Sequence, residues 1–153
     1  MRYAKLFQWV ALFLIVVATL TGAPAIAWGG GSYKLTCVVP AGDPDYGASS
    51  VAKLGNRTFL YYSPYYGGAD VYTAEVSVAC SGLTHGRTYR VVANSWPVGQ
   101  QLVAEFSADA RGDGSAVGGI VVYKTRLYKW YKWSAVRVDV YRDDGTLVFT
   151  GVL

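Results

Sequence analysis

The stretch YTAEVSVAC, Tyr72–Cys80, has the most regular pattern in the chain. Its side chains alternate between apolar and polar from Tyr72 to Val78. The apolar set is Tyr72, Ala74, Val76, Val78 and Cys80, and the polar set between them is Thr73, Glu75 and Ser77. Because successive side chains of a strand point to opposite faces of a sheet, this alternation predicts a half-buried β-strand.

Segments of the same kind lie on both sides of this strand. They are rich in Val, Tyr and Thr, and turn residues such as Asp144-Gly145 separate them. The predicted further strands are residues 33–39, 57–62, 87–94, 101–108, 115–123, 135–142 and 146–152. Eight short strands joined by turns predict an all-β, antiparallel sandwich or barrel with consecutive strands side by side.

The N-terminus has the pattern of a secretory signal. Arg2 and Lys5 precede an apolar run over residues 6–20, and small residues at 25–27 fit a cleavage site before Trp28. We therefore expect a signal helix over residues 1–27, a Gly-rich linker over 28–32 and one β-sandwich domain over 33–153. The protein is expected to be secreted or at the cell surface. The alternative is an uncleaved membrane anchor, because residues 6–28 are just long enough to span a bilayer core.

The charge balance of the mature chain argues against nucleic acid as a partner. Removal of residues 1–27 takes away two of the fourteen Lys and Arg residues, which leaves twelve against ten Asp and Glu. Proteins that bind nucleic acid usually carry a strong basic excess or a basic stripe. No such excess is present here.

The segment SGLTHGRTYRV, residues 81–91, contains the only histidine of the chain, His85. Its Leu83, Gly86 and Tyr89 have the spacing of the tyrosine corner, so the segment resembles that of fibronectin type III and related immunoglobulin-like sandwiches. The resemblance implies a Greek-key, immunoglobulin-like topology and a structural role for Tyr89, whose hydroxyl would bond to upstream main chain. His85 is then expected in an exposed loop.

Cys37 and Cys80 are an even pair in a chain that carries an export signal. Their positions in the alternation place both on inward faces, so we expect a disulfide. The alternative is a pair of reduced core cysteines. Together with His85 they lack the close spacing of a zinc site, and we expect no metal and no cofactor.

Two aromatic segments are candidates for ligand binding. The first, residues 123–133, places cations among aromatic rings, and neither of its alternate faces is purely apolar. Such a segment suits a sugar ring, an anionic polymer or lipid headgroup, or a protein partner. The alternative is that its rings cover the open end of the sandwich while its lysines extend outward. The second, YYSPYYGG at 61–68, is expected to be a loop that exposes its tyrosines. The candidate ligand-binding residues are Tyr128, Lys129, Trp130, Tyr131, Lys132 and Trp133, and Tyr61, Tyr62, Tyr65 and Tyr66.

Nothing in the sequence indicates a catalytic centre. His85 has no nucleophilic partner, and Glu75 and Glu105 fall on the polar faces of their strands. We therefore predict a non-enzymatic structural or adhesive surface protein. It could self-assemble through its terminal strands if these lie at sheet edges. The alternative is a module that binds a polysaccharide or polyanion through residues 123–133. Asn56 begins a glycosylation sequon in a predicted loop.

Overall fold

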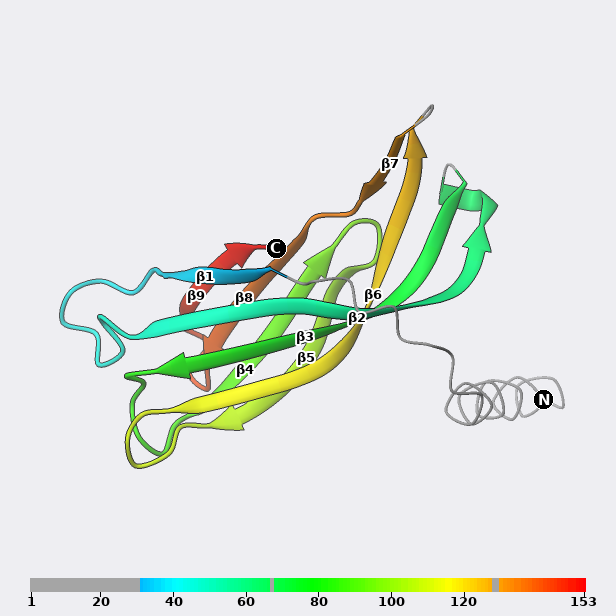
Figure 1. The fold of residues 1–153 in the computed structure, drawn as a ribbon. Helices are drawn as coiled ribbons and strands as arrows, with labels where there is room; N and C mark the ends of the chain where they lie inside the picture. The colour runs from blue at the N-terminus through cyan, green and yellow to red at the C-terminus, as the bar shows by residue number, and fades with distance from the viewer. Residues whose placement is uncertain (1–30, 67, 128–129) are drawn as a thin grey trace, which may run out of the picture.

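The computed structural model describes residues 31–66, 68–127 and 130–153 and confirms an all-β, antiparallel architecture. Nine strands and one 3-10 turn lie in the described residues (Figure 1). The strands are β1 (Ser32–Cys37), β2 (Ser49–Ser63), β3 (Ala69–Ser81), β4 (Thr88–Ser95), β5 (Gly99–Ser107), β6 (Gly114–Leu127), β7 (Trp130–Trp133), β8 (Val136–Arg142) and β9 (Leu147–Val152), and the turn is η1 (Pro64–Tyr66). The predicted signal helix, its cleavage site and most of the 28–32 linker lie outside the described residues.

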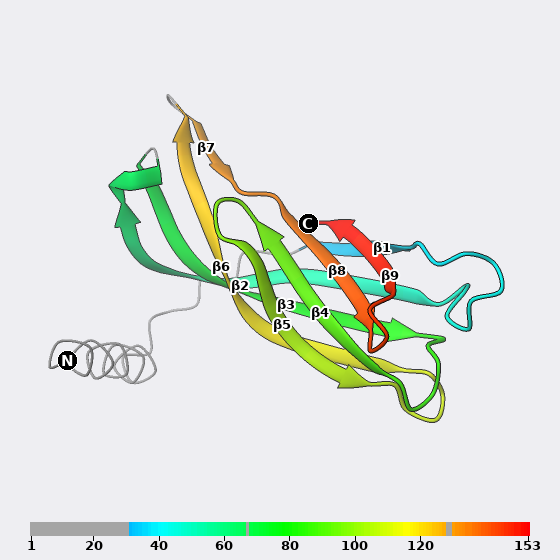
Figure 2. The same ribbon diagram turned by 180° about the vertical axis from the view of Figure 1, so that it is seen from behind.

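The strands form one sheet in the order β5-β4-β8-β9-β1-β2-β3-β6-β7, which folds over into two facing layers. Strands β2, β3 and β6 lie in one layer, and β4, β5, β8 and β9 lie in the other (Figures 1 and 2). One apolar core fills the space between the layers, with Val76 and Val78 on one side and Val138 and Phe149 on the other. The alternation along Tyr72–Cys80 is confirmed, because Ala74, Val76, Val78 and Cys80 are buried.

The two terminal strands lie inside the sheet. The sequence allowed them to be edge strands, but β1 pairs with both β2 and β9, and β9 pairs with both β8 and β1. The sequence pattern could not reveal this, because it specifies which residues face the core and not which strands become neighbours. The condition for assembly through terminal edge strands is therefore not met in the described part of the chain.

The sheet is nearly closed, because β5 comes to lie against the outer edge of β6. The Gln101 carboxamide of β5 takes the place of a missing strand partner: its Nε2 donates to the Val121 carbonyl (2.9 Å), and its Oε1 accepts from the Val121 N–H (2.7 Å). The Ser95 hydroxyl donates to the same carbonyl at 3.1 Å. We call this contact between β5 and β6 the seam.

At the seam, Gly118 of β6 allows the backbones to meet. A Cβ atom at Gly118 would lie 2.1 Å from the Val103 carbonyl oxygen, whereas one at Gly119 would meet nothing within 4 Å. Val103 is the extra residue of a bulge in β5, where Val91 pairs with Ala104 and Val92 with Leu102. Bulges bend a strand locally, and this one lies where β5 crosses β6.

No helix in the described ranges is long and apolar enough to cross a membrane.

Candidate functional site

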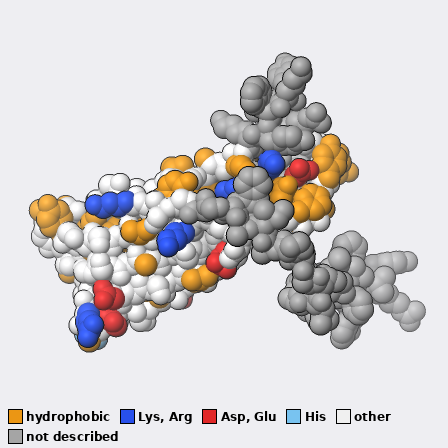
Figure 3. Space-filling model, viewed as in Figure 1, with side chains coloured by type: hydrophobic (Ala, Val, Ile, Leu, Met, Phe, Trp, Pro, Cys, Tyr) orange, Lys and Arg blue, Asp and Glu red, His pale blue; other side chains and the backbone are white. Residues whose placement is uncertain are grey.

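The end of the β2–β3 hairpin exposes a group of large apolar side chains, which we call the aromatic hairpin (residues 59–65). Figure 3 shows hydrophobic side chains gathered at this end of the molecule. Tyr61 and Tyr62, which sequence analysis selected, are exposed, and Tyr65 is 91% exposed. Phe59 and Leu60 belong to the same group and were missed; they are 54% and 45% exposed. The side chain of Tyr66 lies outside the described part.

The alternation of apolar and polar residues did not predict that Phe59 and Leu60 are exposed, because neither face of β2 is covered here. Adjacent strand residues point to opposite faces, so one of the two was expected in the core. Instead, every residue of β2 from Thr58 to Tyr62 is exposed. A signal was available in the sequence, since FLYY is a continuous apolar run with no polar residue between its members.

The outer edge of β2 is also open along this part of the strand. Its partner β1 pairs with residues 50–53, and within the described ranges no strand pairs with residues 54–63 on that side. Unpaired edges expose backbone N–H and C=O groups that can accept another strand. The aromatic hairpin therefore combines exposed rings with an open edge.

Asn56 lies in a bulge within β2, and not in the loop that we expected. The register of β2 against β3 shifts between Gly55 and Thr58, and Asn56 adopts a left-handed φ of 47°. Its side chain is exposed, and Nδ2 donates to Glu75 Oε1 at 3.2 Å. Bulges are hard to predict because local propensity does not specify an unpaired residue.

Trp133 is half-buried, and its ring is already in contact with other side chains. The Arg57 guanidinium lies over the ring, 4.1 Å from its centroid, and Tyr72 meets it edge-on at 4.8 Å. Tyr72 and Trp133 both pack against the core. Burial lowers the pKa of Arg57, and its Nε has no hydrogen-bond partner among the described atoms. This ring therefore covers one end of the core, and the binding role predicted for Trp133 remains a prediction.

The rest of the 123–133 segment is a β-hairpin. Strands β6 and β7 pair from Lys124 with Trp133 to Leu127 with Trp130. Tyr128 and Lys129, together with the side chains of Trp130, Tyr131 and Lys132, lie outside the described residues. The binding role predicted for them remains a prediction.

The expected disulfide is wrong: Cys37 and Cys80 are both free thiols. Cys80 pairs with Ser50 and Ser50 with Leu35, so two strand spacings, about 10 Å, separate β3 from β1. Cys37 lies two residues further along β1. A disulfide needs Cα atoms within about 7 Å. The alternation placed both residues inside correctly, but it carries no information on their separation across the sheet.

The Cys80 thiol is also expected to have low reactivity. It donates to Ser50 Oγ at 3.2 Å, and burial raises its pKa to about 11. The thiolate is the reactive form of cysteine, so a raised pKa makes this side chain a poor nucleophile.

A buried polar cluster joins three loops at the end of the molecule opposite the aromatic hairpin. At its centre is Asp45, which is fully buried. Its carboxylate accepts hydrogen bonds from the Tyr89 hydroxyl (2.9 Å), from the Thr84 N–H (2.8 Å) and hydroxyl (2.6 Å), and from Arg142 Nη1 (2.9 Å). Sequence analysis missed this cluster, because its members are far apart in the chain.

Arg142 is the cation of the cluster. It also donates to Asp43 and to Asp144, at 2.8 and 2.9 Å. The hydrogen bonds to Asp43 above all raise the pKa of Arg142, and Arg142 in turn lowers the pKa of the Asp43 carboxyl. Asp43, Asp45 and Asp144 each form an ion pair with Arg142, so the arrangement is suited to holding loops together.

Tyr89 is completely buried and supports the loop before it. Its hydroxyl oxygen accepts from the Thr84 N–H at 3.1 Å, and its ring stacks on Phe106 with centroids 5.5 Å apart. Burial, together with the hydrogen bond to the Asp45 carboxylate, raises the pKa of the Tyr89 hydroxyl to about 12 from the usual value near 10.

This shift predicts a loss of stability in alkali. A folded-state pKa above the unfolded value favours the protonated form, so the stabilisation is complete below pH 10 and disappears as the pH rises to 12. Two pKa units correspond to about 3 kcal/mol. We expect the free energy of unfolding, measured by urea denaturation, to fall by that order between pH 10 and 12. In Tyr89→Phe the fall should be smaller by the same amount. If the free energy of unfolding fell equally with pH in the two proteins, the raised pKa of Tyr89 would be contradicted.

His85 lies in an exposed turn, as expected, with Nδ1 2.9 Å from the Asp109 carbonyl. The Asp109 carboxylate accepts from the backbone N–H groups of Arg111 and Asp113. These contacts fix the turn between β5 and β6.

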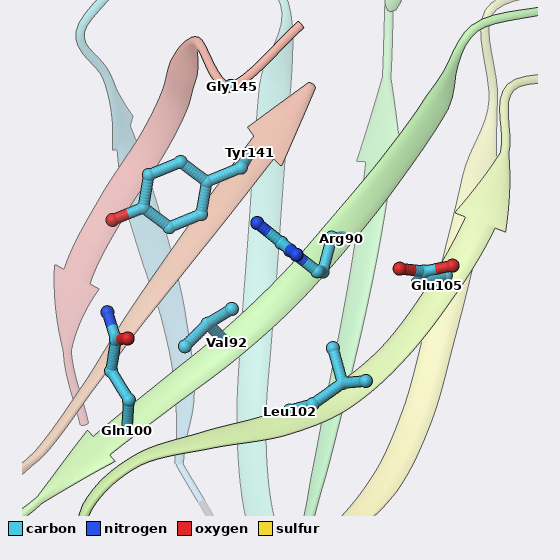
Figure 4. Close-up of a pocket in the computed structure, with 7 residues that line it drawn as sticks. All are labelled: Arg90, Val92, Gln100, Leu102, Glu105, Tyr141 and Gly145. Atoms are coloured by element: carbon cyan, nitrogen blue, oxygen red, sulfur yellow. The ribbon is translucent and has the colours of Figure 1, made fainter. Parts of the chain in front are cut away.

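The outer face of β4, β5 and β8 contains an open hollow of about 510 Å³ (Figure 4). Arg90 projects from β4 between Tyr141 of β8 and Glu105 of β5, and Gln100 lies further along the same face. Val92 and Leu102 lie side by side between these polar groups. Sequence analysis placed Glu105 on a polar face but could not show that this face is hollowed.

In the described part of the chain, no group of three or more His, Cys, Asp or Glu side chains is placed to hold a metal ion. Comparison with known proteins gives no family model, no curated protein and no solved structure that matches this chain.

Proposed function

We propose that this protein is a non-enzymatic structural or adhesive domain of the cell exterior, and that the aromatic hairpin is its contact surface. The observation that carries the proposal is the joint exposure of Phe59, Leu60, Tyr61, Tyr62 and Tyr65 along a strand whose outer edge has no partner strand among the described residues. Exposed contiguous apolar patches on soluble domains mark interaction sites. Tyrosine rings give a large contact area at low entropic cost.

The partner that this surface suits best is a second copy of the chain. An open edge pairs with another extended strand through its backbone, and the rings of two hairpins can then pack on each other. The proposed site of self-assembly is therefore residues 54–63 of β2, in place of the terminal strands considered from the sequence. Asn56 and Arg57 bulge at the start of this edge, so pairing would begin beyond them.

Two further parts of the proposal rest on the sequence. The signal pattern at residues 1–27 supports secretion or display at the cell surface. The spacing of Leu83, Gly86 and Tyr89 supports an immunoglobulin-like, Greek-key sandwich similar to fibronectin type III, and the hydrogen bond from Thr84 to Tyr89 is consistent with a corner of that kind. The non-enzymatic role is supported by four of the groups with shifted pKa values, because Asp43, Tyr89, Arg142 and Asp144 are all bonded within one cluster.

Substitution of the exposed tyrosines tests the contact surface. We expect the purified domain to form dimers or larger species at micromolar concentration, as measured by sedimentation velocity. The variant Tyr61→Ser, Tyr62→Ser, Tyr65→Ser should dissociate at least about tenfold more readily, because each lost ring contributes about 0.5–1.5 kcal/mol to such contacts.

Tyr46→Ser is the matched control for this experiment. Tyr46 is 61% exposed but lies in the loop between β1 and β2, at the other end of the molecule. It should leave association unchanged. A parent protein that stays monomeric up to about 1 mM, or a triple variant that associates like the parent, would exclude homotypic adhesion through this hairpin.

A further inference from the structure

The hollow on the outer face of β4, β5 and β8 continues into a second one. The first, of about 510 Å³, runs from Gln100 to Gly145, and the second, of about 300 Å³, reaches Thr88 and Asp143. Arg90, Glu105 and Gly145 line both. The two hollows therefore form one elongated open groove along the sheet, which we call the β4–β5 groove. Its size is in the range of small-ligand sites.

The polar side chains in the middle of the groove are free. Arg90, Glu105 and Gln100 are exposed, and none has a side-chain hydrogen bond or ion pair within the described ranges. Arg90 lies directly opposite Glu105 in the strand register, yet the two do not form a salt bridge. Other arginines of the same layer, Arg137 and Arg142, are paired with aspartates. The groove thus presents unused donors and an unused acceptor to solvent.

Apolar surface accompanies these polar groups. Leu102 is 58% exposed, Val92 lies beside it, and the half-buried Tyr141 is directly opposite Arg90 on β8. An aromatic ring beside planar hydrogen-bonding groups matches a sugar, whose ring has one face of C–H groups and a rim of hydroxyls. Each hydroxyl both donates and accepts, so it can use the guanidinium, the carboxylate and the carboxamide.

We infer that the β4–β5 groove binds a neutral, linear oligosaccharide. The charges of Arg90 and Glu105 cancel, so the site favours neither an anionic nor a cationic polymer. The elongated shape fits several consecutive sugar units. An extended peptide is disfavoured on this face, because β4 is paired on both sides and has no backbone groups to offer a further strand. This site is separate from the aromatic hairpin and does not depend on it.

Titration with neutral oligosaccharides, followed by NMR on the isotope-labelled protein, tests this inference. The probes are hexamers of β-1,4-glucose, β-1,3-glucose, β-1,4-xylose and β-1,4-mannose, with oligogalacturonate as the anionic comparison. We expect at least one neutral hexamer to bind with a Kd of about 1 mM or below and to shift the amide signals of residues 90–92, 100–105 and 141. The anionic probe should bind more weakly.

Two variants and a control make the result specific. Tyr141→Ala, and separately Arg90→Gln with Glu105→Gln, should weaken binding at least about tenfold while the remaining amide signals stay in place. Tyr46→Ala should bind like the parent, and so should the triple tyrosine variant of the aromatic hairpin. The inference is overturned if no neutral hexamer binds at about 10 mM, if only the anionic probe binds, or if folded groove variants bind like the parent.

Discussion

Asp45→Ala is expected to lower the free energy of unfolding by about 3 kcal/mol. The substitution removes a fully buried carboxylate and leaves the Tyr89 hydroxyl, the Thr84 hydroxyl and one Nη1 bond of Arg142 without their acceptor. Breaking a buried ion pair from one side leaves the other charge uncompensated. The loss should be near the lower end of the usual range, because Arg142 keeps Asp43 and Asp144.

Urea denaturation followed by tryptophan fluorescence measures this effect. Asp45→Asn keeps the size of the side chain and one acceptor oxygen, so its loss should be smaller, about 1–2 kcal/mol. Asp113→Ala removes an exposed turn carboxylate and should change stability by no more than about 0.5 kcal/mol. If Asp45→Ala were as mild as Asp113→Ala, the buried cluster would not hold the three loops together.

The seam between β5 and β6 gives the second large effect. We expect Gly118→Ala to destabilise the protein by about 1–3 kcal/mol, because the new methyl group would lie 2.1 Å from the Val103 carbonyl oxygen. A backbone carbonyl cannot rotate away as a flexible side chain can. β5 and β6 must therefore move apart, which strains the Gln101 bridge to Val121.

Gly119→Ala is the matched control, one residue away on the same strand. Its methyl group meets nothing within 4 Å, and the backbone does not require a left-handed φ. This substitution should be neutral or stabilising by up to about 1 kcal/mol, since alanine restricts the unfolded chain more than glycine does. Hydrogen exchange at the Val121 amide should accelerate in Gly118→Ala and not in Gly119→Ala. Equal stability of the two variants would show that the seam is not closely packed.

The buried cluster and the seam stabilise one scaffold, and the two proposed binding surfaces lie on separate parts of it. The buried cluster around Asp45 fixes the loops at one end, and the aromatic hairpin extends from the other. The β4–β5 groove lies on the outer face of the layer that the seam joins to β6. Variants of the hairpin and of the groove can therefore be tested in the same folded protein.

The alternation of apolar and polar residues along the chain was enough to predict most of the strands and much of the core. The segment Tyr72–Cys80 placed Ala74, Val76 and Val78 inside, and the structure buries all three. This works because the period of a strand is a local property of the backbone. The first part of β2 was missed, since its inward positions Ser50 and Ala52 are too small or polar to mark an apolar face.

Only the tertiary structure decided which strands became neighbours. That choice put β1 and β9 inside the sheet and separated Cys37 from Cys80. Within the described ranges it also left the outer edge of β2 without a partner strand beyond residue 53. It also brought Asp45, Tyr89 and Arg142 into one buried cluster and set Arg90 between Glu105 and Tyr141. The physical reason is that side-chain periodicity fixes the face that a residue occupies, whereas strand order follows from the packing of segments that are remote in the sequence.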